Sequence, residues 1–237
     1  MIPRVLIDSA PVPGGGGELR LIQRGEDFWI MLGANALMST RLRGSEEALA
    51  TLACERIAAR SQPAILIGGL GMGFTLRAAL EALPRDAKVI VSELVPAIVA
   101  WARGPMAHAH GGTLDDPRVA IDESDVGDLI AAARAAYDAI LLDVDNGPDA
   151  LSRDTNDRLY DLDGLRRARA ALRPGGLLAI WSAAPDPAFA RRLGKAGFAV
   201  EEVTVRAHAG RKGAKHVIWI ATDKRDHQMR ARFSGGM

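Results

Sequence analysis

Short apolar segments alternate with helix-forming segments from Pro63 onward, and this alternation limits the fold more than any other feature of the sequence. Five such strand–helix units are typical of a doubly wound parallel sheet with helices on both faces. The fourth expected strand, residues 137–143, is almost continuously apolar, as a strand buried on both faces would be. The expected strands begin at Ala64, Lys88, Arg118, Tyr137 and Leu177. The expected helices cover residues 75–83, 95–102, 126–136, 158–172 and 186–196.

Two more strands, residues 199–206 and 216–221, follow the last helix without a helical segment between them. Such a connection predicts one antiparallel strand at the C-terminal end. The predicted fold class is therefore α/β, a doubly wound and mostly parallel sheet with a C-terminal antiparallel strand.

The first 60 residues form a different kind of segment. Two apolar runs around a turn, residues 18–24 and 28–32, indicate short paired strands, and a helix is expected from Ser45, which can cap it. We therefore expect a reduced N-terminal β-strand and helix segment over residues 1–60 and the ligand-binding α/β domain over 61–223. Residues 224–237 are expected to form a basic, flexible tail.

Composition excludes several classes of protein. The 237 residues carry 30 Lys and Arg against 29 Asp and Glu, so no nucleic-acid partner is expected. The single cysteine, Cys54, excludes a disulfide framework and a cysteine-based zinc site, and we expect it to be a buried small residue. No apolar run reaches the ~18 residues of a membrane span, and the N-terminal residues lack a signal-peptide pattern, so a cytoplasmic protein is expected.

A glycine-rich turn separates the first expected strand of the main domain from its helix. Gly69, Gly71 and Gly73 make the pattern G-x-G-x-G, with Leu70 inside it. A turn there presents backbone N–H groups and a helix N-terminus at the edge of the sheet where ligands of open α/β folds bind. The alternative is a tight packing turn that binds no ligand.

The spacing of these glycines argues against a dinucleotide. The nicotinamide-dinucleotide pattern places its third glycine five residues after the first, where this sequence has Phe74 or Leu76. The tighter pattern suits an adenosyl ligand without a pyrophosphate.

Acidic residues follow the next two expected strands. Glu93, with Leu94 beside it, ends the second strand, where a carboxylate can accept both hydroxyl groups of a ribose. Asp125 follows the third strand and could reach the adenine amino group, or could simply cap the next helix.

An acidic segment follows the fourth strand. We expect Asp143 at the floor of the cleft, opposite the glycine-rich turn, as the base or anchor for an attacking amine. Asp145 and Asn146 are candidate substrate-binding residues. The alternative is a solvated acidic loop with Asn-Gly-Pro turn chemistry.

Other polar groups fit simpler roles. His108 and His110 have no further metal ligands nearby in the sequence, so a loop is predicted there rather than a metal site. The basic residues at positions 211, 212 and 215 could touch RNA, but a solvated hairpin loop is the simpler interpretation.

Taken in this order, the motifs resemble the spermidine synthase (polyamine aminopropyltransferase) family within the class I S-adenosylmethionine-dependent methyltransferase fold. The resemblance implies a Rossmann-like sheet and covers roughly residues 44–221. Its strongest segments are Ile67-Gly-Gly-Leu-Gly-Met-Gly, Val91-Ser-Glu-Leu, Asp116-Pro-Arg-Val, Tyr137-Asp-Ala-Ile-Leu-Leu-Asp and Leu172-Arg-Pro-Gly-Gly.

The resemblance also assigns roles to individual residues. It implies that Glu93 binds the donor ribose, that Asp125 lies near the adenine, and that Asp143 helps to deprotonate the attacking amine. Two departures stand out. Gly71 occupies the place of an Asp that in the family holds the cationic end of decarboxylated S-adenosylmethionine, and the family's Tyr-His-Glu before the first core strand is absent.

The function predicted is aminopropyl transfer from decarboxylated S-adenosylmethionine to a diamine such as putrescine, without a metal. Methyl transfer from S-adenosylmethionine and a non-catalytic adenosyl-binding protein are the alternatives. The expected partner is a small molecule, a polyamine by the resemblance, and neither nucleic acid nor a membrane. Since the family often forms dimers, a homodimer is also allowed.

Overall fold

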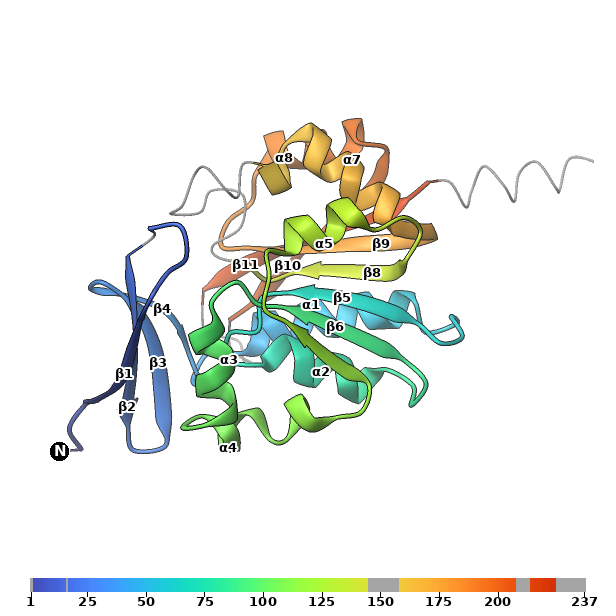
Figure 1. The fold of residues 1–237 in the computed structure, drawn as a ribbon. Helices are drawn as coiled ribbons and strands as arrows, with labels where there is room; N and C mark the ends of the chain where they lie inside the picture. The colour runs from blue at the N-terminus through green and yellow to red at the C-terminus, as the bar shows by residue number, and fades with distance from the viewer. Residues whose placement is uncertain (1, 16, 145–157, 208–213, 225–237) are drawn as a thin grey trace, which may run out of the picture.

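A computed structural model describes residues 2–15, 17–144, 158–207 and 214–224, which form two β-sheets with helices packed around the larger one (Figure 1). The smaller sheet has the strand order β1-β2-β3-β4. The larger sheet has seven strands in the order β10-β11-β9-β8-β5-β6-β7. The predicted fold class is confirmed.

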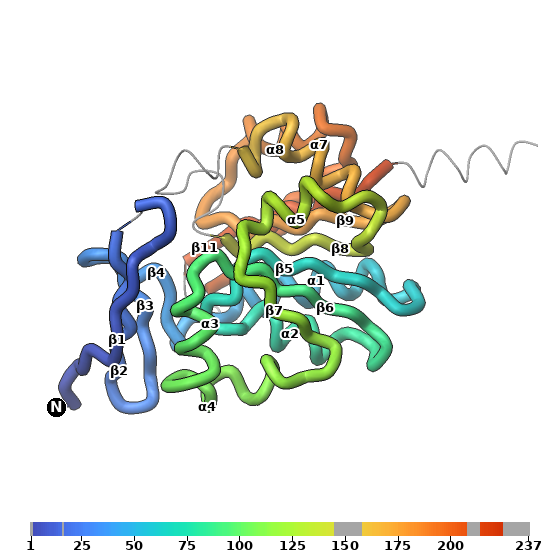
Figure 2. Tube along the Cα trace, in the orientation of Figure 1, coloured from blue at the N-terminus to red at the C-terminus, as the bar shows by residue number. Residues whose placement is uncertain are grey.

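The small sheet is an antiparallel meander beside the main sheet (Figure 2). Its buried face carries Leu19, Leu21, Phe28 and Ile30, so one face of the alternating strands packs against the rest of the protein. Two of its strands were expected, and the structure adds β1 and β4, whose short or largely exposed sequences lack a clear alternating pattern. The strands are β1 (Val5–Pro11), β2 (Glu18–Arg24), β3 (Asp27–Leu32) and β4 (Asn35–Ser39).

The main sheet follows the predicted alternation, with parallel pairing from β9 through β7. The predicted antiparallel strand is β11, which is inserted between β9 and β10 and runs antiparallel to both. β11 is buried along residues 217–221, whereas β10 is the half-exposed edge strand. The strands are β5 (Ala64–Gly68), β6 (Lys88–Ser92), β7 (Val119–Asp122), β8 (Tyr137–Leu142), β9 (Leu172–Ser182), β10 (Phe198–Arg206) and β11 (Lys215–Asp223).

Helices cover both faces of the main sheet and create two hydrophobic cores (Figure 1). α1, α2 and α3 pack into the core that also includes the small sheet, and α5, α7 and α8 pack on the other face. Among the described residues, no helix is both long and apolar enough to cross a membrane. The helices are α1 (Gly44–Arg56), α2 (Phe74–Ala82), α3 (Pro96–Arg103), α4 (Ala107–His110), η1 (Thr113–Asp115), α5 (Val126–Ala132), α7 (Leu162–Ala171) and α8 (Pro187–Lys195).

Two local predictions are corrected. Ser45 does not cap α1, because the N-cap position is Arg43 and the Ser45 side chain lies buried inside the first turn. Pro174, Gly175 and Gly176 were expected to separate a helix from a strand, but β9 already starts at Leu172 and runs through them. Leu172 pairs with Tyr137 of β8, so β9 begins before the Pro-Gly-Gly segment, and the register of the two strands shifts between Tyr137 and Ala139. The predicted tail lies outside the described residues except for Lys224.

One buried carboxylate joins the starts of three strands. Asp138 of β8 is 1% exposed, and its Oδ2 accepts hydrogen bonds from the backbone N–H of Ala64 (2.9 Å) and from Nη1 of Arg173 (2.6 Å). Arg60 Nε lies 3.8 Å from Oδ1. Both arginines reach solvent, so their charges stay hydrated when Asp138 is removed. The main cost is therefore the loss of the hydrogen-bond acceptor for the Ala64 N–H.

We predict that Asp138→Ala lowers the free energy of unfolding by about 2–3 kcal/mol, because it leaves a buried donor without an acceptor and breaks two ion pairs. Urea denaturation measures the change. The matched control is Asp163→Ala, which removes an exposed carboxylate paired with Arg166 and should cost less than about 0.5 kcal/mol. Equal losses in the two variants would contradict the structural role of Asp138.

Candidate functional site

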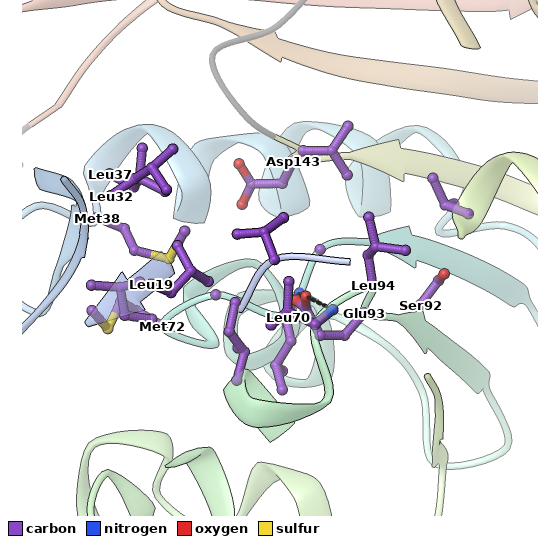
Figure 3. Close-up of a pocket in the computed structure, with 18 of the residues that line it drawn as sticks. Leu19, Leu32, Leu37, Met38, Leu70, Met72, Ser92, Glu93, Leu94 and Asp143 are labelled. Atoms are coloured by element: carbon purple, nitrogen blue, oxygen red, sulfur yellow. Dashed lines mark hydrogen bonds between the residues drawn. The ribbon is translucent and has the colours of Figure 1, made fainter. Parts of the chain in front are cut away.

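A cavity of about 540 Å³ lies where the carboxyl ends of β5, β6, β7 and β8 face the small sheet. This volume is in the range of small-molecule sites. Figure 3 shows two differing ends, one at Ser92, Glu93 and Leu94 and the other at Leu32, Leu37 and Met38, with Asp143 above the space between them. The polar residues that line the cavity are Ser39, Glu46, Ser92, Glu93, Ser124, Asp125 and Asp143.

The glycine-rich turn forms one wall, as predicted. It connects β5 to α2, and Gly69, Gly71 and Gly73 all have positive φ angles of 92°, 50° and 76°. A side chain on Gly69 would collide with the backbone carbonyl of Asp143, so glycine permits the turn to pack directly on the end of β8. The Gly69 N–H donates to the Ser92 carbonyl at 2.8 Å, which ties the turn to β6 as well.

Glu93 fastens the turn to the end of β6. Its side chain is buried, with Oε2 accepting the Leu70 N–H and Oε1 accepting the Val95 N–H, both at 2.9 Å (Figure 3). A carboxylate oxygen can accept more than one hydrogen bond, so these contacts are compatible with a ligand hydroxyl at the same group. Leu94, next along the chain, is 41% exposed and lines the cavity.

Asp125 does cap a helix. Its Oδ1 accepts the Gly127 N–H at 2.7 Å at the start of α5, which is the simpler of the two roles predicted for it. It also lines the cavity, next to Ser124 and Val126. Its contact with an adenine ring therefore stays a prediction.

Asp143 is the most perturbed carboxyl group of the site. Burial raises its pKa to about 7, the nearby Glu46 carboxylate raises it as well, and a hydrogen bond from Thr75 lowers it. The Thr75 hydroxyl donates to Oδ2 at 2.6 Å and so fixes the orientation of the carboxyl group. Such a group can exchange protons near neutral pH, as a general base requires.

Glu46, in the first turn of α1, is a site residue that sequence reasoning missed. Burial raises its pKa, and it lines the cavity close enough to Asp143 for the two charges to interact. In the sequence it was simply one of two acids at a helix start. No local pattern distinguishes Glu46 from Glu47, because only the packing of α1 brings it to β8.

A chain of hydrogen bonds continues from Glu46 away from the cavity. The Ser45 hydroxyl donates to Glu46 Oε2 at 2.8 Å, and its oxygen lies 2.9 Å from Nδ1 of His216 on β11. Burial lowers the pKa of His216, whose ring packs edge-on against Trp181 at 4.8 Å. The buried position of Ser45 is thus used to hold Glu46 rather than to cap the helix.

Met38 occupies the space in front of Gly71. A Cβ atom on residue 71 would lie 3.0 Å from the Met38 sulfur, so an acidic side chain there would displace this methionine. An apolar group from β4 therefore fills the space where the resemblance predicts an acid at position 71.

The histidines predicted to lie in a loop belong to the short helix α4. His110 is buried against Gly73, both of its ring nitrogens lack a hydrogen-bond partner, and burial lowers its pKa to about 4. His108 stacks obliquely on Phe28 at 5.5 Å. Within the described ranges, no group of three or more potential metal ligands is found.

Cys54 is buried in α1, as expected, and burial raises its pKa to about 12. Four other predicted residues, Asp145, Asn146, Arg211 and Lys212, lie outside the described residues. Lys215, the last residue of the basic patch, begins β11 and is exposed.

Comparison with known proteins places this fold and site in context. No family model matches the chain. This chain aligns with the structure of human methyltransferase-like protein 13 in complex with SAH. The TM-score is 0.55 at 19% identity, and the alignment covers 75% of this chain and 79% of that one. The architecture is therefore that of a class I methyltransferase fold.

Within this fold, the chain is similar to the aminopropyltransferases. It is 28% identical over 173 residues to a polyamine aminopropyltransferase of Mycobacterium tuberculosis, over 71% of this chain and 31% of that protein. A spermidine synthase in complex with the transition state analogue AdoDATO aligns with a TM-score of 0.69 at 18% identity, covering 93% of this chain and 73% of that one. The predicted resemblance is confirmed, although the chain spans only 27% to 39% of the length of the curated relatives it matches.

The raised pKa of Asp143 predicts a pH-dependent effect on stability. The pKa of this carboxyl group rises from 3.8 to about 7 on folding. Its effect on the free energy of unfolding is therefore a loss that grows as the pH rises from about 4 to about 7 and stays constant at higher pH. Because Asn cannot ionise, Asp143→Asn should raise the free energy of unfolding most above pH ~7, and progressively less toward pH ~4. Urea denaturation across this range measures the difference.

The control for this experiment is Asp163→Asn, which changes an exposed carboxylate that does not line the cavity. It should alter stability little at any pH in this range. A gain from Asp143→Asn that does not vary with pH would contradict the burial of an ionisable group at this position.

Proposed function

We propose that this chain is a spermidine synthase-like transferase that binds an S-adenosyl sulfonium donor and transfers its aminopropyl group to an amine. The donor would be decarboxylated S-adenosylmethionine, and the acceptor would be a polyamine-class molecule such as putrescine. One observation carries the proposal. Asp143, a carboxyl group whose pKa is raised to about 7, shares a cavity with Glu93 and the glycine-rich turn.

The donor nucleoside would bind at the ends of β5, β6 and β7. Glu93 would accept hydrogen bonds from the ribose hydroxyls, while Leu70 and Leu94 would contact the nucleoside. Gly69, Gly71 and Gly73 let the backbone approach the ligand closely. Asp125 would lie near the adenine. The similarity to aminopropyltransferases and to the AdoDATO-bound spermidine synthase supports this arrangement.

Asp143 would act on the acceptor. An ammonium group cannot attack, so the acceptor must first lose a proton, which the ionised Asp143 can take. The neutral amine then forms a C–N bond to the aminopropyl carbon that is bonded to the sulfonium sulfur. The bond between this carbon and sulfur breaks, and its electron pair returns to sulfur. The proton released from the new ammonium also requires a base. Methylthioadenosine and the alkylated amine are the products, and no metal ion takes part.

Methyl transfer from S-adenosylmethionine is the second candidate. It is favoured by the contact of Met38 with Gly71, because the acid expected to hold an aminopropyl cation is replaced by an apolar group. A non-catalytic adenosyl-binding protein would use the same donor site without turnover.

Incubation with each donor separates these functions. The protein would be mixed with decarboxylated S-adenosylmethionine or with S-adenosylmethionine, each together with diamines and a metabolite extract, and the nucleoside product read by mass spectrometry. Diamine-dependent methylthioadenosine from the decarboxylated donor is expected. Adenosylhomocysteine from the other donor would instead show a methyltransferase, and donor binding without either product would favour a binding protein.

We predict that Asp143→Asn abolishes turnover and changes the donor dissociation constant by no more than a few-fold, because the residue acts on the acceptor. In the wild-type protein, kcat should rise with pH through about 7 as Asp143 ionises. Steady-state kinetics and calorimetry measure both effects. Normal turnover by Asp143→Asn would show that the role is wrongly assigned.

Glu93→Ala should weaken donor binding by roughly 1–3 kcal/mol, since the ribose hydroxyls lose their acceptor. Because Glu93 also accepts the N–H groups of Leu70 and Val95, circular dichroism and thermal melting must first show that the variant folds. An unchanged dissociation constant in a folded variant would count against this ribose site.

Three further assignments stay predictions. Asp145 and Asn146 are proposed to bind the acceptor, and the location is proposed to be cytoplasmic.

A homodimer is proposed with β1 as its contact strand, because Val5, Leu6 and Ile7 are exposed apolar residues at the edge of the small sheet. Analytical ultracentrifugation tests the dimer.

A further inference from the structure

A second carboxyl group lies beside Asp143 in the cavity. Glu46, from the first turn of α1, lines the same space. Burial raises the pKa of Asp143, and the charge of Glu46 raises it further. The Thr75 hydroxyl connects the two residues, because its oxygen lies 2.6 Å from Oδ2 of Asp143 and 3.4 Å from the backbone carbonyl oxygen of Glu46. Of these two neighbouring acids, the transfer reaction described above uses only Asp143.

Two carboxyl groups that lie close together in a poorly solvated site do not readily ionise together. Repulsion between their charges favours a state in which the pair holds one proton. Burial also raises the pKa of Glu46, whereas the hydrogen bond from Ser45 lowers it and the charge of Glu47 raises it. Both members of the pair can therefore gain and lose a proton in a pH range where ordinary carboxyl groups stay ionised.

The other charged groups near the pair are held by partners of their own. Glu47 lies 3.6 Å from Arg43 and 3.2 Å from Arg77 of α2, and it does not line the cavity. Glu93 and Asp125 line the cavity at the ends of β6 and β7, where both accept backbone N–H groups.

Glu46 is held in place from the side of β11. The Ser45 hydroxyl donates to Glu46 Oε2 at 2.8 Å, and its oxygen lies 2.9 Å from Nδ1 of His216. The His216 ring packs edge-on against Trp181 of β9, and His216 pairs with Val205 of β10. Because Ser45 is only 1% exposed, water does not readily replace its hydroxyl as the donor to Glu46.

We propose that Glu46 is a second catalytic carboxyl group of the transfer reaction, that it shares one proton with Asp143, and that Ser45, supported by His216, is its positioning residue. This inference rests on the proposed function and adds a group to it. In the resting site the pair holds one proton. An acceptor ammonium that binds beside the pair stabilises both carboxylates, so this proton leaves to solvent.

The two carboxylates then account for the protons of the reaction. The acceptor ammonium gives one proton to the pair, and the neutral amine attacks the aminopropyl carbon. The C–N bond forms as the bond between this carbon and sulfur breaks, and the electron pair of that bond returns to sulfur. The second carboxylate is the base that takes the proton of the new ammonium. Both protons pass to solvent or back to the product amine when it leaves.

The kinetic test compares neighbouring residues of α1. Glu46→Gln removes the ionisable group but keeps an oxygen that can accept the Ser45 hydroxyl. With decarboxylated S-adenosylmethionine and putrescine, it should lower kcat for methylthioadenosine formation at least about tenfold. The dissociation constant of methylthioadenosine should change by no more than a few-fold. Glu47→Gln is the matched control and should keep the wild-type kcat, so equal kcat values in the two variants would overturn the role of Glu46.

A titration of the ligand-free protein tests the shared proton without turnover. Carbon-13 NMR of labelled Asp and Glu carboxyl groups follows each ionisation, and the spectra of Asp143→Asn and Glu46→Gln identify the two signals. The pKa of Asp143, about 7 in the wild-type protein, should be lower by at least about 1 in Glu46→Gln, because the neighbouring charge is removed. Glu47→Gln should change it much less. An unchanged titration of Asp143 in Glu46→Gln would show that the two groups do not share a proton.

The same measurement tests the positioning residue. Ser45→Ala should raise the pKa of Glu46, because the ionised carboxylate loses the hydrogen bond that favours it. Thr51→Ala is the matched control, since it removes an exposed hydroxyl of α1 that bonds only to the Glu47 carbonyl, and it should leave the titration of Glu46 unchanged. If Ser45→Ala folds and Glu46 titrates as in the wild-type protein, Ser45 does not position this group.

Failure of the proposed function can be recognised separately. If no methylthioadenosine forms from the decarboxylated donor with any amine, aminopropyl transfer is contradicted. The carboxyl titrations need neither donor nor acceptor, so they decide in either case whether Glu46 and Asp143 share a proton.

Discussion

The close approach of one backbone segment to two strand ends holds this site together. Gly69 packs on the Asp143 carbonyl, its N–H donates to Ser92, and the Asp143 N–H donates to Gly68 at 3.0 Å. These contacts require a residue without a side chain in a left-handed conformation. With the turn in place, Glu93 and Asp143 line a single cavity although they follow different strands.

The chemistry of the site follows from where its carboxyl groups are buried. Glu93 accepts backbone N–H groups, which stabilise a buried carboxylate, whereas Asp143 has the Thr75 hydroxyl and a neighbouring acid. The first arrangement makes an acceptor for hydroxyl groups, and the second makes a group that can gain and lose a proton near neutral pH. A cationic ligand beside Glu46 and Asp143 would relieve the repulsion between the two acids.

The small sheet supplies one wall of the cavity at the edge of the α/β domain. It is attached through contacts such as the hydrogen bond from Trp101 Nε1 on α3 to Asp8 on β1 at 2.7 Å. Its inner residues supply the apolar wall, and Met38 takes the space that an acid at position 71 would need. Gly71 and the apolar side chain that covers it therefore meet from two distant parts of the chain.

Much of this could be predicted from the sequence because local patterns determine it. The alternation from Pro63 determines the doubly wound sheet, the glycine spacing determines the turn after β5, and the strand ends identify Glu93 and Asp143 as residues of one edge. Tertiary packing alone decided that Glu46 lies beside Asp143, that Ser45 hydrogen-bonds Glu46 instead of capping α1, that β11 lies between β9 and β10, and that Met38 covers Gly71. The physical reason is that hydrophobic periodicity and turn chemistry are set by a few neighbouring residues. These contacts instead join segments that are far apart in the chain, and no local sequence pattern specifies which distant segments meet.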